Sequence, residues 1–507
     1  MHPTKVSRLG DGKMTFLPVL LGLDLTVIEG MMRFSEHFKL GLTQPYLDFV
    51  DIRLDTDVPV FLEPTAIKSL SSPWGNELAS LLQTFFEEVL TLIRSGSNDK
   101  AQRLLSSLNE RNEFHLGYSA HESRGHGFGS GSAKSVWGAL SQSDAVRTGL
   151  LRDLEDTALL IPGIGTDMIS DAVCNILRGP LIRYTQDMCS FYGVPLTPDV
   201  DSGPIWNAEA GKWETALVPL PITPYGKVIL VPKLLVRQRL SYRFDEYYRN
   251  YLLPQMQQEH LSARSSLVEV LSDGRERVTK KALMEKYGRD KLAAVRETQL
   301  RPRVLDEYRE YKESNVSSPL SHEQLSEVEG VELPDLDALL LEMKALAPGR
   351  NDADAYEKII EKIFSVIFYP SLCNPKKQAI LHQGRKRVDI TYSNEAKSGF
   401  FAWLSLHYCA PLIFIECKNY GKEVGNPEID QLSSRFGPSR GQVGILVCRS
   451  IEDRVLLLER CKDTAKDRRG YMLVLEDKDI EALVRTYSDD RDNVFESFRQ
   501  QWNNLIN

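Results

Sequence analysis

The run Pro411-Leu412-Ile413-Phe414-Ile415 leads directly into Glu416-Cys417-Lys418, and this stretch decides the fold of the last third of the chain. Its apolar residues are rich in β-formers, so it predicts a buried strand. Alternate residues of a strand share a face. We therefore expect Glu416 and Lys418 to point the same way, and Cys417 to face the opposite packing layer.

A second strand-like run carries an acid. Arg387-Val388-Asp389-Ile390-Thr391-Tyr392 alternates like a strand, and if it lies beside the first run, Asp389 joins Glu416 and Lys418 on one face. Phosphodiester hydrolysis at neutral pH requires an activated water and charge relief on the phosphate. A Mg²⁺ ion held by hard oxygen ligands supplies both. Two carboxylates and a lysine at neighbouring strand ends predict such a site.

The flanking sequence adds two helices and a strand. Residues 355–364 form an amphipathic pattern from which Glu357 or Glu361 could approach the metal, and Glu357 is favoured because it follows an aromatic residue. Residues 427–432 open a second helix, from which Gln431 is placed to reach back towards the strand ends. Residues 444–448 then read as another buried strand. The predicted order is helix, strand, strand, helix, strand.

An acid-x-lysine triplet is weak evidence by itself, because the spacing recurs in this chain. The other instances are Glu310/Lys312, Glu342/Lys344, Glu395/Lys397 and Glu476/Lys478. The first two lie in helical surroundings and the third in a polar loop. Glu476 follows an apolar run and is a genuine rival, but no acid-bearing strand precedes it. Asp477 and Asp479 are typical of the start of the next helix.

Residues 350–485 resemble the PD-(D/E)xK, or restriction-endonuclease-like, nuclease superfamily. The resemblance rests on Asp389 as the motif aspartate, Glu416-Cys417-Lys418 as the ExK triplet, Glu357 on the preceding helix and Gln431 on the following one. Two features depart from the pattern. Val388 stands where the motif has proline, and residues 390–415 exceed the compact spacing, which implies an insertion at about 394–408.

The resemblance implies a mixed sheet flanked by helices and Mg²⁺-dependent phosphodiester cleavage, with Mn²⁺ as a substitute ion. Asp389 and Glu416 would bind the metal, and Lys418 would orient or help to deprotonate the attacking water. Glu357 would complete the metal's surroundings, and Gln431 would support Lys418 or a phosphate. Candidates for contacts to the phosphates of nucleic acid, with double-stranded DNA favoured, are Arg385, Arg387, Arg435 and Arg440. Cutting both strands would need a homo-oligomer.

The 507 residues are too many for one core, and the sequence predicts an α/β (α+β) multidomain protein. Its expected parts are a mixed α/β domain at 1–250, a charged helical connector and linker at 251–337, and the nuclease-like domain at 338–507. A net charge of −8 disfavours broad non-specific binding of nucleic acid without excluding a nuclease. The seven cysteines form no CxxC pair, and the apolar stretch 16–28 is too broken to span a membrane. We therefore expect a cytoplasmic location and no membrane partner.

The first two-thirds of the chain carry weaker signals. We expect short strands at 49–54 and 58–62, helices at 78–93 and 167–178 with Gly179-Pro180 ending the latter, and a hairpin of 213–222 with 227–236. Residues 125–135 resemble a phosphate loop, but Ala133 replaces the required glycine, so a loop is favoured. Residues 278–287 fit a connecting arm better than a DNA-contacting helix-turn-helix.

Three hypotheses follow. The favoured one is a metal-dependent endonuclease with an N-terminal regulatory or targeting domain, which would suit antiphage defence by family analogy alone. The second is a catalytically inactive nucleic-acid-binding or scaffold protein on a nuclease fold. The third is an N-terminal domain that binds a small signalling ligand and gates cutting.

Overall fold

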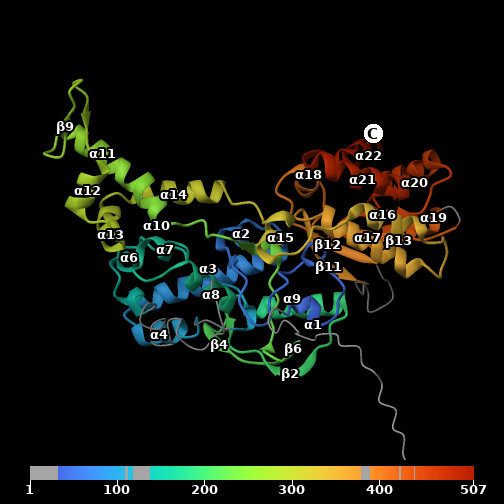
Figure 1. Cartoon of the computed structure of the whole chain (residues 1–507), viewed down its shortest axis with the longest axis horizontal. Coiled ribbons are helices and arrows are strands. Elements are labelled where there is room, and N and C mark those ends of the chain that lie inside the picture. The colour runs from blue at the N-terminus through green and yellow to red at the C-terminus, as the bar shows by residue number, and fades with distance from the viewer. Residues whose placement is uncertain (1–31, 109–111, 118–137, 378–388, 422–423, 439) are drawn as a thin grey trace, which may run out of the picture.

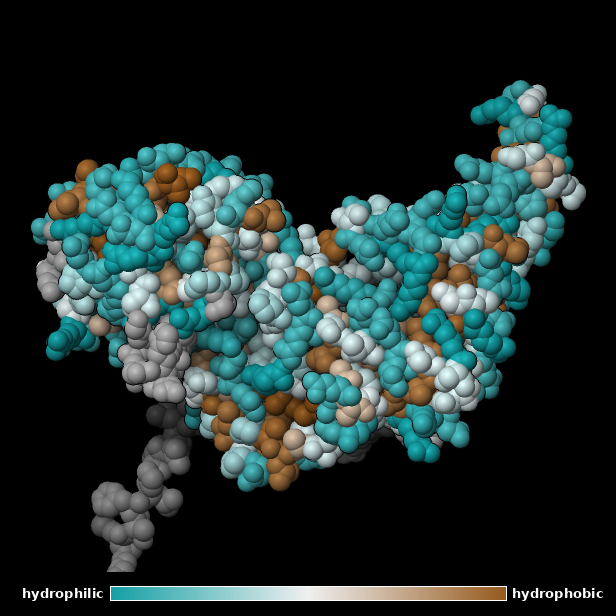
Figure 2. Space-filling view, turned by 180° about the vertical axis from the view of Figure 1, so that it is seen from behind, coloured by the Kyte–Doolittle hydropathy of each residue, from teal (hydrophilic) through white to brown (hydrophobic). Residues whose placement is uncertain are grey.

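The computed structural model describes residues 32–108, 112–117, 138–377, 389–421, 424–438 and 440–507, which mix helices and strands (Figure 1). The C-terminal sheet and its helices lie at one end of the molecule, and the N-terminal helices and short strands lie in the middle. A helical arm that includes residues 253–287 projects at the other end. Figure 2 shows from behind how this arm, largely hydrophilic at its tip, stands out from the body. No helix in these ranges is both long and apolar enough to cross a membrane.

The C-terminal region is built on one mixed five-stranded sheet in the order β11-β12-β13-β14-β15. The strands are β11 (Leu372–Lys377), β12 (Ile390–Asn394), β13 (Leu412–Lys418), β14 (Val443–Cys448) and β15 (Tyr471–Glu476). β12 pairs antiparallel with both β11 and β13, whereas β13, β14 and β15 run parallel. The predicted strands β12, β13 and β14 are confirmed, and β11 is an addition that the sequence did not indicate.

Two hydrophobic clusters cover the two faces of this sheet. Ile413 and Ile415 of β13 pack in the cluster that contains α17, whereas Phe414 packs in the cluster that contains α19 and α20. The helices are α16 (Leu336–Ala345), α17 (Ala353–Ile367), α18 (Gly399–His407), α19 (Asn426–Ser433), α20 (Arg454–Lys466), α21 (Asp477–Asp489), η5 (Arg491–Asn493) and α22 (Glu496–Ile506). The predicted helices α17 and α19 are confirmed, and α18 occupies the expected insertion.

The N-terminal region is helical with short paired strands. Its elements are α1 (Phe34–His37), η1 (Gln44–Tyr46), β1 (Phe61–Leu62), α2 (Pro64–Ser69), α3 (Pro73–Arg94), α4 (Asn98–Leu105), η2 (Asn112–Phe114), α6 (Asp144–Arg147), α7 (Asp156–Leu160), α8 (Thr166–Ile176), α9 (Arg178–Tyr192), β2 (Thr197–Asp201), β3 (Ile205–Asn207), β4 (Lys212–Glu214), β5 (Leu217–Leu220), β6 (Ile222–Thr223), β7 (Gly226–Lys227), η3 (Lys233–Leu235) and β8 (Val236–Arg237). The helix predicted at 78–93 is confirmed within α3.

Three N-terminal predictions need correction. Of the strands expected at 49–54 and 58–62, only β1 forms, because the backbone there bonds to scattered partners such as Val231 and His115 instead of one neighbouring strand. The hairpin expected around 224–226 exists only at its tip, as β6 with β7, while β5 pairs with β2 and β4 with β3. Gly179 and Pro180 do not end helical structure. They lie in the first turn of α9, where proline costs no hydrogen bond.

The connector is helical, as predicted, except for one short hairpin formed by two strands of two residues each. Its elements are α10 (Phe244–Tyr247), the π-helix η4 (Tyr248–Leu252), α11 (Leu253–Ser262), β9 (Glu269–Val270), β10 (Glu276–Arg277), α12 (Lys280–Tyr287), α13 (Lys291–Leu300), α14 (Pro302–Ser314) and α15 (His322–Glu329). Its core residues belong to the same hydrophobic cluster as the N-terminal helices. The end of the predicted connector and linker, residues 251–337, contains α15, where the ring of buried His322 bonds to the carbonyl oxygen of Val366 on α17.

Candidate active site

The pairing of β12 with β13 brings the two predicted metal-binding acids together. Ile390 pairs with Ile415 in this antiparallel ladder, so continuing the register by one residue sets Asp389 opposite Glu416. The backbone N–H of Cys417 donates to Oδ2 of Asp389 at 2.8 Å, which fixes that carboxylate against the end of β13. Asp389 therefore lies at the strand end as the sequence indicated.

Lys418 and Gln431 both hold one oxygen of Glu416. Lys418 Nζ donates to Oε1 at 2.7 Å, and Gln431 Nε2, reaching back from α19, donates to the same oxygen at 2.5 Å. The Glu416 side chain is only 1% exposed, and its other oxygen, Oε2, is buried without a hydrogen-bond partner. A buried carboxylate oxygen without a partner is costly, so this atom is available to a cation.

The two metal-binding acids are buried, and the charges of Lys418 and Arg435 only partly offset the effect of burial on their pKa values. Burial raises the pKa of Asp389, and burial together with the nearby Asp389 charge raises the pKa of Glu416. Burial lowers the pKa of Lys418, but Glu416 and Asp389 outweigh this effect and the pKa is raised on balance, which keeps the ammonium charged. Closely spaced acids with raised pKa values are typical of functional sites, because their charge is unrelieved without a bound ion or proton.

Glu357 of α17 is the predicted helix acid that approaches this site. Burial and then the charge of Asp389 raise its pKa to about 7. The alternative, Glu361, instead forms an ion pair with Lys377 of β11 at 2.6 Å. The neighbouring Tyr356 packs in the core, and its hydroxyl donates to Asp477 at 2.8 Å. The Asp389 charge acting on Glu357 and the ion pair that occupies Glu361 favour Glu357 over Glu361 as the third acid.

The four predicted phosphate-binding arginines fall into different places. Arg385 and Arg387 lie outside the described residues. Arg435 is 6% exposed, and its charge acts on both Asp389 and Glu416, so it belongs to the acid cluster more than to an outer surface. Arg440 lines a cleft on the same face of the sheet, whose wall contains Arg183 of α9, a residue that the sequence did not single out.

The rival triplet at Glu476 is fully occupied by structural contacts. Glu476 forms ion pairs with Arg454 at 2.8 Å and Lys478 at 2.7 Å, and its carboxylate accepts the N–H of Ile451. Its pKa is lowered: burial alone would raise it, but these partners outweigh burial. As predicted, Asp477 begins helix α21. Glu476 thus closes a strand–helix junction.

Two stretches of the N-terminal region, residues 125–135 and helix α8, carry predictions from the sequence. The phosphate-loop-like residues 125–135 lie outside the described residues. On α8, the buried polar residues Ser170 and Asn175 make core contacts: Ser170 accepts the N–H of Leu62, and Asn175 accepts from the buried Arg178 guanidinium, which also donates to Glu113 at 2.6 Å. The helix predicted at 167–178 is confirmed as α8, whose N-cap is Gly165.

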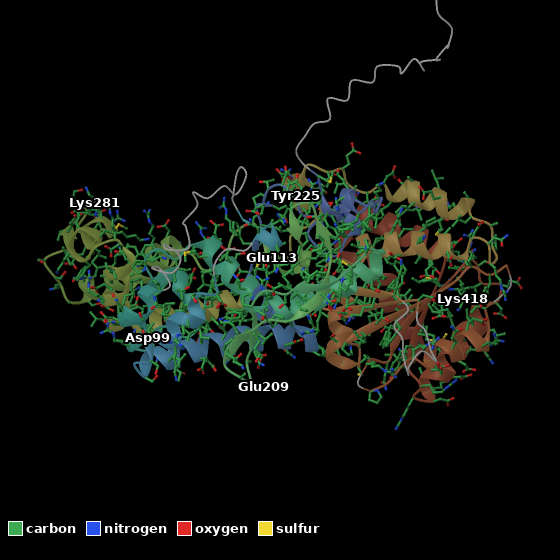
Figure 3. All side chains as sticks on the ribbon, turned by 90° about the horizontal axis from the view of Figure 1, so that it is seen from below. Asp99, Glu113, Glu209, Tyr225, Lys281 and Lys418 are labelled. Carbon is green, nitrogen blue, oxygen red and sulfur yellow. The ribbon has the colours of Figure 1, made fainter. Side chains whose placement is uncertain are left out.

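The donor set fits a hard divalent cation that is completed by water. Within the described ranges no three His, Cys, Asp or Glu side chains form a group that could hold a metal ion. Asp389 and the free Oε2 of Glu416 nevertheless provide two carboxylates, and Mg²⁺ commonly keeps several waters and binds through one or two carboxylates. Figure 3 places Lys418 in the C-terminal region, at the opposite end of the molecule from Lys281 on α12.

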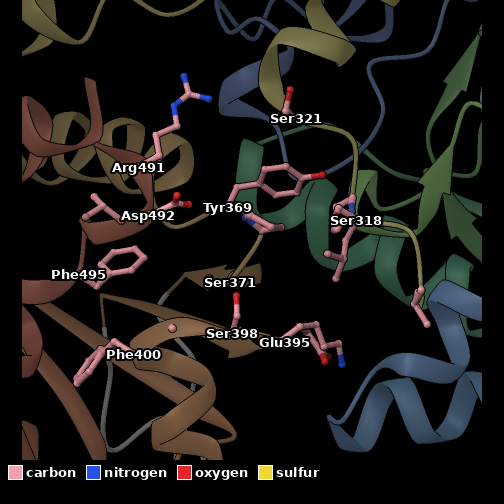
Figure 4. A pocket seen from close by; sticks show the side chains of 18 of the residues that line it. Ser318, Ser321, Tyr369, Ser371, Glu395, Ser398, Phe400, Arg491, Asp492 and Phe495 are labelled. Atoms are coloured by element: carbon pink, nitrogen blue, oxygen red, sulfur yellow. The ribbon is translucent and has the colours of Figure 1, made fainter. Parts of the chain in front are cut away.

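A cavity of about 850 Å³ lies away from these acids, where the N-terminal region, the segment before α15 and the C-terminal helices meet. Figure 4 shows Tyr369, Glu395 and Arg491 around it. None of the acid-site residues Asp389, Glu416 or Lys418 lines it. One oxygen of Glu395 is buried there without a partner.

Comparison with known proteins adds one similarity. Residues 39–243 match the model of a domain of unknown function, DUF8370. No curated protein and no solved structure matches the chain. The match covers the N-terminal helices and short strands and ends before the acid site, so the geometry of the C-terminal region has to carry any functional proposal.

Proposed function

We propose that the chain is a Mg²⁺-dependent endonuclease of restriction-endonuclease-like fold, which hydrolyses phosphodiester bonds of nucleic acid, with double-stranded DNA as the favoured substrate. One observation carries the proposal. Asp389 and the unpartnered Oε2 of Glu416 meet at adjoining strand ends, with Lys418 held beside them by Glu416. The matched N-terminal region would regulate or target cutting, in a cytoplasmic setting.

Each side chain has a distinct role in this proposal. Asp389 and Glu416 would hold Mg²⁺, or Mn²⁺ in its place, and the ion would lower the pKa of a bound water and neutralise charge on the phosphate. Lys418, kept charged by the neighbouring acids, would hold the attacking water in line with the phosphorus. Glu357, the acid of α17 that feels the Asp389 charge, would exchange a proton with that water.

A plasmid assay tests the proposal directly. Wild-type protein with Mg²⁺ should convert supercoiled plasmid to nicked or linear forms, and Lys418→Ala should abolish the conversion. Lys478→Ala is the matched control, because it removes the lysine of the rival triplet, whose side chain is 69% exposed. The control should cut like wild type. If neither wild type nor control cuts plasmid, linear duplex or single strands with any divalent ion, the protein is the inactive nucleic-acid-binding or scaffold alternative.

The form of the product reports the assembly. A single site cuts one strand, so linear product formed in one encounter requires two sites and hence a homo-oligomer. Nicked circles that accumulate before linear plasmid would indicate a monomer. Sedimentation of the same protein, with and without DNA, gives the oligomeric state independently.

A further inference from the structure

A cleft of about 510 Å³ lies beside the acid site on the same face of the sheet. Its floor includes Thr391 of β12 and Phe414 of β13, which are two residues along their strands from Asp389 and Glu416. Alternate residues of a strand share a face and two residues span about 6.6 Å, so the cleft begins one side chain away from the acids. A strand held in the cleft would therefore run into the proposed catalytic centre.

The opposite wall of the cleft comes from the N-terminal region. Trp74 in the first turn of α3 and Arg183 of α9 line it. The Trp74 ring stacks on Tyr184, with centroids 6.1 Å apart. The backbone next to this tryptophan makes a tight corner, because a Cβ added at Gly75 would lie 2.2 Å from Cβ of Leu70. An aromatic side chain in a rigid setting is a suitable platform for a nucleobase.

The lining of the cleft favours a phosphate-bearing ligand. Arg183, Lys376 and Arg440 contribute three cations to a lining with one carboxylate, Asp187. Arg183 is paired with Glu77 of α3, and Lys376 is paired with Asp187, so a bound phosphate would replace these carboxylates. The hydroxyl of Thr391, a residue only 5% exposed, is buried without a hydrogen-bond partner on the floor of the cleft. A positively charged groove with an aromatic platform is the combination that binds single-stranded nucleic acid.

The cleft is narrow, because the two walls touch across it. Lys376 of β11 and Asp187 of α9 form an ion pair at 2.8 Å. A second contact lies beside the lining residue Ser72, where the N–H of Ser71 donates to Glu395 at 3.3 Å. Walls joined by an ion pair leave no room for a duplex, and a single extended strand in the cleft would exchange the Asp187 carboxylate at Lys376 for a phosphate.

We propose that this cleft binds an unpaired segment of the substrate strand next to the scissile phosphate, with a base on Trp74 and phosphate at Arg183, Lys376 and Arg440. This inference rests on the proposed nuclease function and narrows it. The preferred substrate would have a single-stranded stretch on one side of the cut, and the region that matches DUF8370 would supply part of the substrate site.

Binding of labelled oligonucleotides to full-length protein tests the inference. Fluorescence anisotropy is measured on the Lys418→Ala background with Ca²⁺, so that the DNA stays intact, using a single-stranded oligodeoxynucleotide and its blunt duplex. Trp74→Ala should weaken single-strand binding about tenfold, as expected for loss of one stacked base. Arg183→Glu should weaken it and reduce its salt dependence, because a phosphate contact is lost. Duplex binding should change little in either variant.

Controls separate the inference from the nuclease proposal. Arg147→Glu alters an arginine of α6 whose side chain is 62% exposed, and it should bind like the parent. Arg183 is 57% exposed, so its variant should fold even if Trp74→Ala does not. Hydrolysis of bis(p-nitrophenyl) phosphate, which is too small to need the cleft, is measured separately on wild type and on Arg147→Glu, and both should hydrolyse it if the nuclease proposal holds. Unchanged single-strand binding in both variants would overturn the inference. If the cleft variants lose single-strand binding but wild type does not hydrolyse the ester, only the nuclease proposal is overturned.

Discussion

Replacing Glu357 with glutamine should stabilise the metal-free protein at alkaline pH. The pKa of Glu357 is raised from 4.5 to about 7 by burial and by the Asp389 charge. A group with a raised folded-state pKa contributes its full stability below the unfolded pKa and loses that contribution as the pH rises through the folded pKa. Wild type should therefore lose stability between about pH 4.5 and 7, and Glu357→Gln should lose less.

The size of this effect follows from the shift. About 2.5 pKa units at about 1.36 kcal/mol each give an upper limit of about 3.4 kcal/mol. The carboxyl is only half-buried and solvent screens part of its interaction with Asp389, so about 1–2 kcal/mol is expected at pH 8. Saturating Mg²⁺ should shrink the difference, because the cation neutralises the same charges.

Urea unfolding at pH 5 and pH 8, in EDTA and in Mg²⁺, measures the effect. The control is Glu87→Gln on the exposed face of α3, which should change the free energy of unfolding by less than about 0.5 kcal/mol at either pH. If Glu357→Gln destabilises the metal-free protein at pH 8, the electrostatic account of the acid cluster is wrong. The same conclusion follows if Mg²⁺ leaves the difference unchanged.

Three further outcomes are expected. Gln431→Ala removes one donor from Oε1 of Glu416 and should slow plasmid cleavage about 10–100-fold in initial-rate assays, and an unchanged rate would contradict a role in orienting that carboxylate. Glu476→Gln should leave the cleavage rate unchanged, since its ion pairs are structural, and a loss like that of Lys418→Ala would move the active site to β15. Arg178→Met leaves Glu113 without its buried partner and should lower the free energy of unfolding by about 3–5 kcal/mol in urea titrations, whereas a loss below about 1 kcal/mol would show that Glu113 finds another donor.

Most of the C-terminal sheet could be predicted from the sequence because its strands are long apolar runs. Strand β11 could not be. It contains Pro375 and polar residues, has a register shift between Cys373 and Lys376, and places Asn374 at a positive φ of 52°. Proline is tolerated in an edge strand, where its missing N–H is not needed. The sequence of β11 therefore shows no alternation of apolar and polar residues from which the strand could be predicted.

The N-terminal region resisted prediction for a different reason. Its strands are two to five residues long, too short for a period of two to stand out. The acid site was predictable because Asp389, Glu416 and Lys418 meet through one pair of adjoining strands. The cleft was not, because Trp74 and Arg183 reach Phe414 only through tertiary packing, and no linear pattern joins positions so far apart in the chain.

Packing at the sheet edge explains why the N-terminal region forms one wall of the cleft. Asp48 lies in the segment that matches DUF8370, and its buried carboxylate accepts both the N–H of Asn374 on β11 and the hydroxyl of Tyr184 on α9. An edge strand exposes unpaired backbone groups that invite aggregation unless something covers them. Here one buried carboxylate joins the edge strand to the helix that carries Arg183. The contact that protects the sheet edge therefore also positions the cleft wall, so the two regions should function as one substrate-binding unit.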